Sequence, residues 1–254
     1  MKTITVCNQK GGVGKTTTST ALAAGLMLRG RKVLLIDCDP QGNSTDTYRA
    51  SMAEGSPTLA DLLFSDVPAD QCVQHTETGD ILAADQLLRH PERFLEGLAA
   101  FFRMKQRLAP LMGNYDHIII DTPPNVSLLL QNALIASDGV IVPVTCDRYS
   151  LKGMTQFSQT LLDIKTQGNS ALRILGLLLV RYDGRTKLTK EALSGIPAVA
   201  EELGTDLFDT YIRESVKARE AQATRSTLFD WAPESTTAQD YNAFIDELVR
   251  KEIL

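Results

Sequence analysis

A glycine-rich stretch near the N-terminus, Asn-Gln-Lys-Gly-Gly-Val-Gly-Lys-Thr-Thr at residues 8–17, constrains the fold of this chain more than any other part of the sequence. It follows a short apolar run at residues 4–7 and precedes a helical pattern of small and large apolar residues at 17–29. A strand, a glycine-rich loop and a helix in this order form a phosphate site, because backbone N–H groups and the helix N-terminus face the anion. The sequence therefore predicts a phosphate-binding loop at residues 8–17.

Two side chains of this loop are of the types that bind a nucleoside triphosphate. Lys15 can reach the β- and γ-phosphates, and the Thr16 hydroxyl can hold Mg²⁺. The generic P-loop has glycine where this chain has Gln9, but the stretch matches in full the deviant Walker A form, Lys-Gly-Gly-x-Gly-Lys-Thr, which adds Lys10. A glycine-rich turn that binds nothing is the alternative, and the flanking strand and helix argue against it. The residues predicted to bind the nucleotide here are Lys10, Gly11, Gly12, Val13, Gly14, Lys15, Thr16 and Thr17.

Composition argues against several other classes of protein. The chain of 254 residues has a net charge of −5, so no overall basic field attracts nucleic acid. Its four cysteines (Cys7, Cys38, Cys72 and Cys146) are widely spaced, which argues against a disulfide framework or a zinc site and favours a reducing cytosol. The first strand is expected almost at the N-terminus, leaving no room for a signal peptide, and the apolar runs are too short to span a bilayer. We therefore expect a cytoplasmic protein without stable membrane association.

Apolar runs typical of buried strands alternate with helical patterns along the chain. Strands are expected at residues 4–7, 33–36, 80–84, 118–120, 140–144 and 174–180, with an edge strand at 207–212. Helices are expected at 17–29, 58–64, 91–112, 126–136, 150–165, 187–203 and 241–254, with a polar loop at 42–55. Ser150 is the expected N-cap of its helix, and Thr236 or Thr237 that of the last one. This alternation predicts an α/β fold with a doubly wound, mainly parallel sheet flanked by helices, as a single P-loop domain at residues 1–254.

Three carboxylates follow apolar strands at the edge of the predicted sheet where the phosphate loop lies. Asp37 and Asp39 follow the strand at 33–36, and Asp121 follows three consecutive isoleucines. An acidic residue at this edge can hold Mg²⁺ through its waters, and Asp121 is the best placed to do so. Asp39 is better placed to orient an attacking water, while Asp37 can support the loop by hydrogen bonding. One aspartate after a strand is more often a turn or cap residue, but three beside a phosphate loop favour a catalytic site.

Three stretches of the sequence resemble the ParA/Soj family of partition ATPases, within the larger group of MinD and nitrogenase iron proteins. They are the loop at residues 10–17, Leu-Leu-Ile-Asp-Cys-Asp-Pro-Gln-Gly-Asn at 34–43, and Ile-Ile-Ile-Asp-Thr-Pro-Pro at 118–124. The similarity continues through Val-Pro-Val at 142–144 and Tyr-Asp-Gly-Arg-Thr-Lys at 182–187, so it covers nearly the whole chain.

The resemblance implies a role for each residue singled out above. Lys10 would be the signature lysine, which reaches across a sandwich dimer to the nucleotide of the partner subunit. Lys15 and Thr16 would bind phosphate and Mg²⁺, Asp39 would activate water, and Asp121 would be the Walker B acid. The implied cofactors are ATP and Mg²⁺. The implied catalytic residues are Lys10, Lys15 and Asp39, and the implied metal-site residues are Thr16, Asp39 and Asp121.

The resemblance also implies an ATP-dependent homodimer, non-specific DNA binding by that dimer, and slow hydrolysis that a ParB-type partner stimulates. The chain departs from the family in the segment that packs on the adenine, where Arg213, Glu214 and Ser215 stand in place of the usual Pro-Arg-Asn. Base recognition therefore stays open, and the residues expected on that side are Arg181, Arg213 and Ser215. Because the predicted first strand begins almost at residue 1 and no helix-turn-helix precedes it in this sequence, we expect the chain to group with the short, Soj-like members.

Positive charge is concentrated in the C-terminal third of the chain. Residues 181–190 carry a net charge of +3 and residues 211–225 a net charge of +2, so the remainder carries −10. Such residues form either solvated helix faces or a surface that contacts phosphates. Lys217 matches a DNA-contacting arginine of Soj-like proteins. The residues predicted to bind DNA are Arg185, Lys187, Lys217, Arg219 and Arg225, which would associate the protein with the nucleoid.

Four other functions are alternatives to partition. A MinD-like membrane-associated ATPase needs a basic amphipathic C-terminal helix, but acidic residues accompany the apolar side of the last helix here. An iron protein-like reductase needs two cysteines placed to share a cluster, and a tyrosine kinase of this type needs a C-terminal tyrosine cluster, where this chain has Tyr241 alone. A nucleotide-binding module that no longer hydrolyses ATP is the fourth.

Overall fold

The structure is a computed structural model that describes residues 2–146, 148–184, 193 and 195–254, with residues 148–156 described by their backbone. Eight strands form one sheet in the order β3-β4-β2-β5-β1-β6-β7-β8. Every neighbouring pair is parallel except β3 and β4. The strands are β1 (Lys2–Val6), β2 (Val33–Asp37), β3 (Gln74–His75), β4 (Asp80–Leu82), β5 (His117–Asp121), β6 (Gly139–Thr145), β7 (Arg173–Tyr182) and β8 (Leu207–Arg213). The predicted doubly wound, mainly parallel α/β fold is confirmed, with β8 at the predicted edge.

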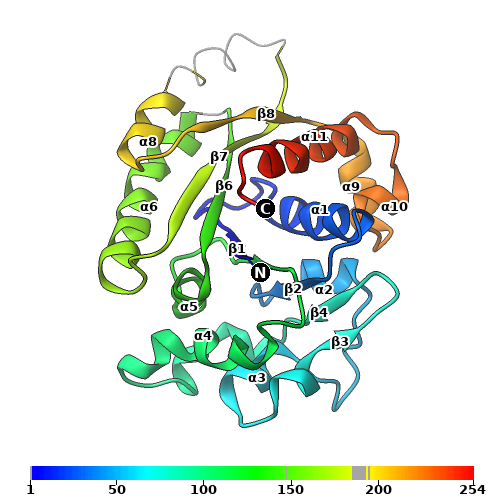
Figure 1. Cartoon of the computed structure of the whole chain (residues 1–254), viewed down its shortest axis with the longest axis vertical. Coiled ribbons are helices and arrows are strands. Elements are labelled where there is room, and N and C mark those ends of the chain that lie inside the picture. The colour runs from blue at the N-terminus through cyan, green and yellow to red at the C-terminus, as the bar shows by residue number, and fades with distance from the viewer. Residues whose placement is uncertain (1, 147, 185–192, 194) are drawn as a thin grey trace.

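Helices cover both faces of this sheet, with α1, α10 and α11 on one side and α5, α6 and α8 on the other (Figure 1). The α-helices are α1 (Lys15–Leu28), α2 (Asn43–Thr47), α3 (Leu59–Phe64), α4 (Arg103–Leu108), α5 (Leu128–Ala136), α6 (Arg148–Gln167), α8 (Ile196–Glu202), α9 (Val216–Ala223), α10 (Leu228–Trp231) and α11 (Thr236–Arg250). Short 3-10 helices are η1 (Ala69–Cys72), η2 (Gln86–Arg89), η3 (Pro91–Arg93), η4 (Leu98–Phe102) and η5 (Ala109–Leu111).

The central strands are apolar on both faces because each face has its own core. In β5, Ile119 packs into the cluster beneath α1 and α11, while Ile118 and Ile120 pack into the cluster beneath α3, α4 and α5. All three isoleucines are fully buried. Two-sided burial explains why the strand reads as a continuous apolar run, and it places Asp121 at the loop edge of the sheet.

Two predicted segments differ from the structure. The expected helix at residues 91–112 is broken into η3, η4, α4 and η5, because Gly97 adopts a left-handed φ of 72° and proline begins or enters two of the pieces. Residues 42–55, expected as a loop, contain α2. This helix has a weak local signal and is held by hydrogen bonds from Ser44 and Thr45 to buried carboxylates.

Helix ends also differ from the prediction at two places. Helix α6 begins at Arg148, so Ser150 is not its N-cap. Helix α11 begins at Thr236 with Ser235 as its cap, because the Ser235 hydroxyl accepts the N–H of Ala238. The predicted helix at 187–203 is observed as α8 over its second half, and residues 187–192 lie outside the described residues.

Strand β8 is fixed to α11 by a buried carboxylate. Its pairing with β7 shifts register between Leu177↔Leu207 and Leu179↔Tyr211. Between these points the N–H groups of Asp209 and Thr210 each donate to a carboxylate oxygen of Glu247, both at 2.8 Å. Glu247 is only 3% exposed. The helix therefore supplies the acceptors that the irregular strand pairing leaves out.

Replacing Glu247 with alanine is expected to lower the free energy of unfolding by about 2–4 kcal/mol, because two hydrogen bonds to a buried carboxylate are lost. Burial by itself would raise the pKa of Glu247, but hydrogen bonds from Lys251, Thr210 and Asp209 lower it to about 2. A lowered pKa means that this stabilisation is complete above the ordinary value of 4.5 and is lost as the pH falls from 4.5 towards 2. Urea denaturation at pH 7 and at pH 3 measures both effects.

The neighbouring Asp246 provides the control for this prediction. It is exposed and pairs with Arg29 at 2.7 Å, so Asp246→Ala is expected to change the stability by less than about 1 kcal/mol. The Glu247→Gln variant keeps one oxygen acceptor and should fall between the two. Equal stability of Glu247→Ala and Asp246→Ala would contradict this account of β8.

Candidate functional site

The glycine-rich loop lies between the end of β1 at Val6 and the start of α1 at Lys15. Gly14, the N-cap of α1, has a left-handed φ of 76°, a conformation that favours glycine. Asn8 anchors the other end of the loop: its side-chain amide donates to the Pro143 carbonyl at 2.7 Å and accepts the N–H of Lys10 at 3.0 Å. Sequence reasoning did not single out Asn8, although it is the first polar residue after the strand.

Lys15 is held inside this loop. Its ammonium group donates to the carbonyl of Lys10 at 2.9 Å, and the residue is 7% exposed. Burial lowers the pKa of Lys15, and the negative charges of Asp121 and Asp39 oppose that change. The Lys15 ammonium group carries three N–H donors, and the Lys10 carbonyl accepts one of them. The other donors can bind an anion.

A cavity of about 580 Å³ opens beside the loop. The predicted nucleotide-binding residues that line it are Gly11, Gly12, Gly14, Lys15, Thr16, Thr17, Arg181, Arg213 and Ser215. Val13 is buried and does not line this cavity. Lys10 does not line it either, but borders an adjacent hollow with Gly11, Gly12 and Val13. The two lysines of the loop therefore border different hollows: Lys15 lines the cavity, and Lys10 lines the adjacent hollow.

Asp37 and Asp121 stand side by side at the ends of β2 and β5, fully buried. Burial raises the pKa of both carboxyls, and for Asp37 the charge of Asp121 adds to the rise. Asp37 accepts the N–H and hydroxyl of Thr45 at 2.7 and 2.8 Å, so it supports the following loop by hydrogen bonding. Asp121 accepts the hydroxyls of Ser19 at 3.1 Å and Ser44 at 2.8 Å.

These contacts around Asp121 suit a magnesium site. Hydroxyls of Ser19 in the loop helix α1 and of Ser44 in α2 converge on this one carboxylate. The Thr16 side chain lies close enough to lower the pKa of Asp121. A carboxylate and a hydroxyl beside a phosphate loop are the ligands with which such proteins hold Mg²⁺ or its bound waters. Thr16 and Asp121 fit that ion.

Asp39 lies between the buried carboxylates and the cavity. It lines the cavity and is 8% exposed, its N–H donates to Asp37 at 3.1 Å, and its carboxylate accepts the N–H of Gln41 at 3.0 Å. One carboxylate oxygen thus fixes the turn, which leaves the side chain able to accept a proton or a hydrogen bond from a water in the cavity.

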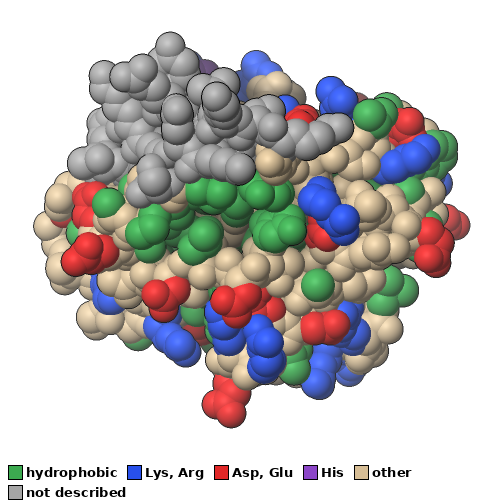
Figure 2. All heavy atoms as spheres, turned by 90° about the horizontal axis from the view of Figure 1, so that it is seen from above, with side chains coloured by type: hydrophobic (Ala, Val, Ile, Leu, Met, Phe, Trp, Pro, Cys, Tyr) green, Lys and Arg blue, Asp and Glu red, His purple; other side chains and the backbone are tan. Residues whose placement is uncertain are grey.

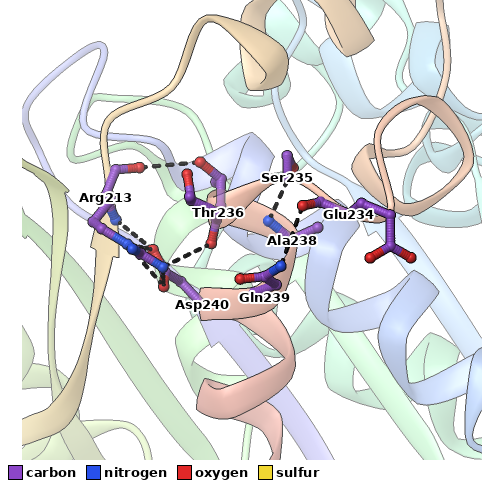
Figure 3. Close-up of polar contacts among 8 residues, drawn as sticks. Arg213, Glu234, Ser235, Thr236, Ala238, Gln239 and Asp240 are labelled. Carbon is purple, nitrogen blue, oxygen red and sulfur yellow. Dashed lines mark hydrogen bonds and ion pairs between the residues drawn. The ribbon is translucent and has the colours of Figure 1, made fainter.

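Two arginines that line the cavity are already paired with carboxylates. The Arg213 guanidinium forms a fork with Asp240, at distances down to 2.6 Å, beside the N-terminus of α11 (Figure 3). The Arg181 guanidinium donates to the Gly12 carbonyl at 3.2 Å and pairs with Glu214 at 2.9 Å. The sequence did not indicate that Asp240 and Glu214 bind these two arginines.

Ser215 and Tyr241 also line this cavity. The Ser215 hydroxyl caps α9 by accepting the N–H of Lys217 at 3.1 Å. The Tyr241 hydroxyl hydrogen-bonds that of Thr18 at 2.9 Å, and the ring is 1% exposed. Burial raises the pKa of Tyr241 well above its usual range. An enclosed tyrosine at the cavity wall does not resemble the tyrosine tail of a kinase.

The described residues among those predicted to bind DNA, Lys217, Arg219 and Arg225, lie on or just after α9. Arg185 and Lys187 lie outside the described residues. Arg219 lines the cavity, so it lies closer to the nucleotide site than the sequence suggested. On the face shown in Figure 2, Lys and Arg side chains are interspersed with acidic ones.

Lys217 and Arg225 lie on or just after α9 and are each paired with a carboxylate. Lys217 contacts Glu220 at 2.8 Å within the same helix. Arg225 contacts Asp46 of α2 at 2.6 Å. Both cations are about half exposed, so a phosphate group would have to compete with these carboxylates for them.

Comparison with known proteins decides the family. The model of a family described as AAA domain matches residues 1–174. The sporulation initiation inhibitor protein Soj of Bacillus subtilis is 36% identical over 243 residues, which cover 94% of this chain and 95% of that protein. The chain belongs to the ParA/Soj family of P-loop ATPases. The chromosome partitioning protein ParA of Caulobacter vibrioides is 31% identical over 99% of this chain and 95% of its own length.

A solved structure matches the fold over the same length. It is a Mycobacterium smegmatis protein named cobyrinic acid a,c-diamide synthase, with a bound ATP analogue and magnesium. It is 32% identical, covers 99% of this chain and 95% of its own, and superposes with a TM-score of 0.86. The predicted ParA/Soj resemblance is thereby confirmed at the level of family and fold.

Proposed function

We propose that this protein is a partition ATPase that binds ATP with Mg²⁺ and hydrolyses it slowly to ADP and phosphate. The observation that carries the proposal is that Lys15, Thr16 and Asp39 line one nucleotide-sized cavity. The buried Asp121 lies behind that lining, close to Lys15 and Thr16. Mg²⁺-dependent phosphate release from ATP by the purified protein tests it, and ADP production without a requirement for Mg²⁺ would contradict it. The family membership supports the partition role.

Each of these residues has one task in the proposed reaction. Lys15 and the loop N–H groups bind and neutralise the phosphates, and Thr16 and Asp121 would hold Mg²⁺, which supplies further positive charge at the transferred phosphoryl group. Asp39 orients the attacking water and accepts its proton. Little covalent chemistry is needed, since phosphoryl transfer depends mainly on positioned charge.

We propose a homodimer that ATP brings together, with Lys10 acting on the nucleotide of the partner subunit. Lys10 borders a different hollow from the cavity that Lys15 lines, which supports a role outside its own site. A cation supplied by a second subunit can stabilise the transition state as an arginine finger does, an effect of about 10³–10⁵ in rate in strong cases. Hydrolysis would then be coupled to dimer formation.

We propose non-specific DNA as the ligand of the dimer, with a ParB-type protein as the partner that stimulates hydrolysis and a location on the nucleoid. The rival MinD-like function is less well supported. The apolar side chains of the last helix, Phe244, Ile245 and Leu248, are fully buried against the rest of the protein, so they are not available to a lipid surface. No helix among the described residues is long and apolar enough to cross a membrane.

The dimer with ATP is expected to bind unrelated DNA duplexes, and Lys217→Glu is expected to weaken that binding by about tenfold or more at low salt. The reason is that one subunit offers few cations, whereas two copies double the phosphate contacts. Fluorescence anisotropy of labelled duplexes measures the affinity for DNA with ATP, with ADP and without nucleotide, across a salt series.

The control for the change in charge is Lys165→Glu, in the last turn of α6. Its affinity for DNA should stay close to that of the unchanged protein. Equal binding in all three nucleotide states, or full binding by Lys217→Glu, would count against the DNA proposal. Binding to anionic liposomes in place of DNA would favour the MinD-like function.

A further inference from the structure

Helix α2 is attached on its inner side to the two buried carboxylates of the site. The Ser44 hydroxyl donates to Asp121 at 2.8 Å, and Thr45 donates its N–H and its hydroxyl to Asp37 at 2.7 and 2.8 Å. Ser44 and Thr45 are both buried. The position of this short helix is therefore set by the hydrogen bonds of Asp37 and Asp121.

The outer side of the same segment is attached to the turn after α9. The next residue, Asp46, forms an ion pair with Arg225 at 2.6 Å. Arg49, just after α2, donates its Nε–H to the carbonyl of Arg225 at 3.0 Å and lies 3.5 Å from the Ser226 hydroxyl. Six consecutive residues thus connect the proposed magnesium carboxylate with Arg225, a residue proposed to contact DNA.

We propose that Asp46 is an intramolecular competitor for nucleic-acid phosphate at Arg225, and that occupancy of the nucleotide site controls this competition through α2. This inference rests on the proposed binding of DNA. Carboxylate and phosphate oxygens occupy the same N–H groups of a guanidinium, so Arg225 cannot engage both fully. Asp46 therefore withholds Arg225 from DNA in the conformation described.

The link to the nucleotide follows from the acceptors that hold α2. Asp121 offers two carboxylate oxygens, and Ser19 and Ser44 each donate to one of them. A ligand that engages Asp121 competes with these donors, and a change at Ser44 moves Asp46, two residues away, relative to Arg225. The Asp46–Arg225 pair is half exposed on both sides, so it contributes little to folding and can be exchanged.

Asp46→Asn tests the competition directly. Without nucleotide, this variant is expected to bind unrelated duplex DNA about three- to tenfold more tightly than the unchanged protein at low salt, because Arg225 is released. The dependence of log affinity on log salt should steepen by about 0.9, the value for one added phosphate contact. With ATP the two proteins should bind nearly alike, so the gain in affinity on adding ATP becomes smaller.

Two variants separate this effect from a general change in charge. Asp246→Asn removes the same charge on α11, where Arg29 is the partner, and should leave DNA binding without nucleotide unchanged. Adding Arg225→Gln to Asp46→Asn should abolish the gain. Thermal unfolding of all variants should stay close to that of the unchanged protein, since both ion pairs are exposed.

The outcomes distinguish this inference from the function on which it rests. If the unchanged protein binds DNA with ATP but Asp46→Asn gains nothing without nucleotide, the competition is overturned and the DNA proposal stands. An equal gain in Asp246→Asn also overturns it, because net charge then explains the effect. If neither protein binds DNA in any nucleotide state, the proposed DNA binding itself fails.

Discussion

Lys15→Ala is expected to lower the affinity for ATP with Mg²⁺ by at least about 100-fold. The lysine lines the cavity, is 7% exposed, and donates to the carbonyl of Lys10 at 2.9 Å. Alanine removes the charge-assisted hydrogen bonds to two phosphate groups in a partly desolvated site. Isothermal titration calorimetry with ATP and Mg²⁺ measures the loss.

Lys10→Ala is the matched control, since it makes the same change in the same loop. The Lys10 side chain borders the neighbouring hollow and not the cavity, so the affinity of the monomer for ATP should change by no more than a few-fold. Dimer formation and hydrolysis should instead be lost. Unchanged affinity for ATP in Lys15→Ala would remove the assignment of the phosphate loop.

Asp39→Ala is expected to slow hydrolysis by about 10²–10⁴-fold while ATP still binds, because the residue that accepts the proton of the attacking water is gone. The dimer with ATP should then accumulate, since hydrolysis is the step proposed to end it. Phosphate release gives the rate, and sedimentation velocity with ATP gives the fraction of dimer.

A second variant at this position separates chemistry from structure. One oxygen of Asp39 accepts the N–H of Gln41, and Asp39→Asn keeps that acceptor but cannot take up a proton. It should match Asp39→Ala in rate and the unchanged protein in thermal stability. A monomer that binds ATP without dimerising, seen in both variants, would contradict the proposed cycle.

Several features of the fold followed from local sequence. The strand, loop and helix at the N-terminus, the apolar β5 and the mainly parallel sheet were all predicted and are confirmed, because each depends on periodicity or on residue types over a few positions. The predicted helix at 91–112 was wrong because Gly97 and two prolines outweigh its apolar spacing. Helix α2 was missed because its stability comes from Asp37 and Asp121, not from its own residues.

The sequence by itself determined the family, the phosphate loop and the presence of three acidic residues at one sheet edge, since these lie in short contiguous motifs. Only the tertiary structure decided how the acids divide their contacts, with Asp37 holding α2 and Asp39 facing the cavity. It also decided that Arg213 is bound by Asp240 and Arg225 by Asp46. Each of these ion pairs joins residues far apart in the chain. The sequence shows both charges, but only the folded structure shows which of them are in contact.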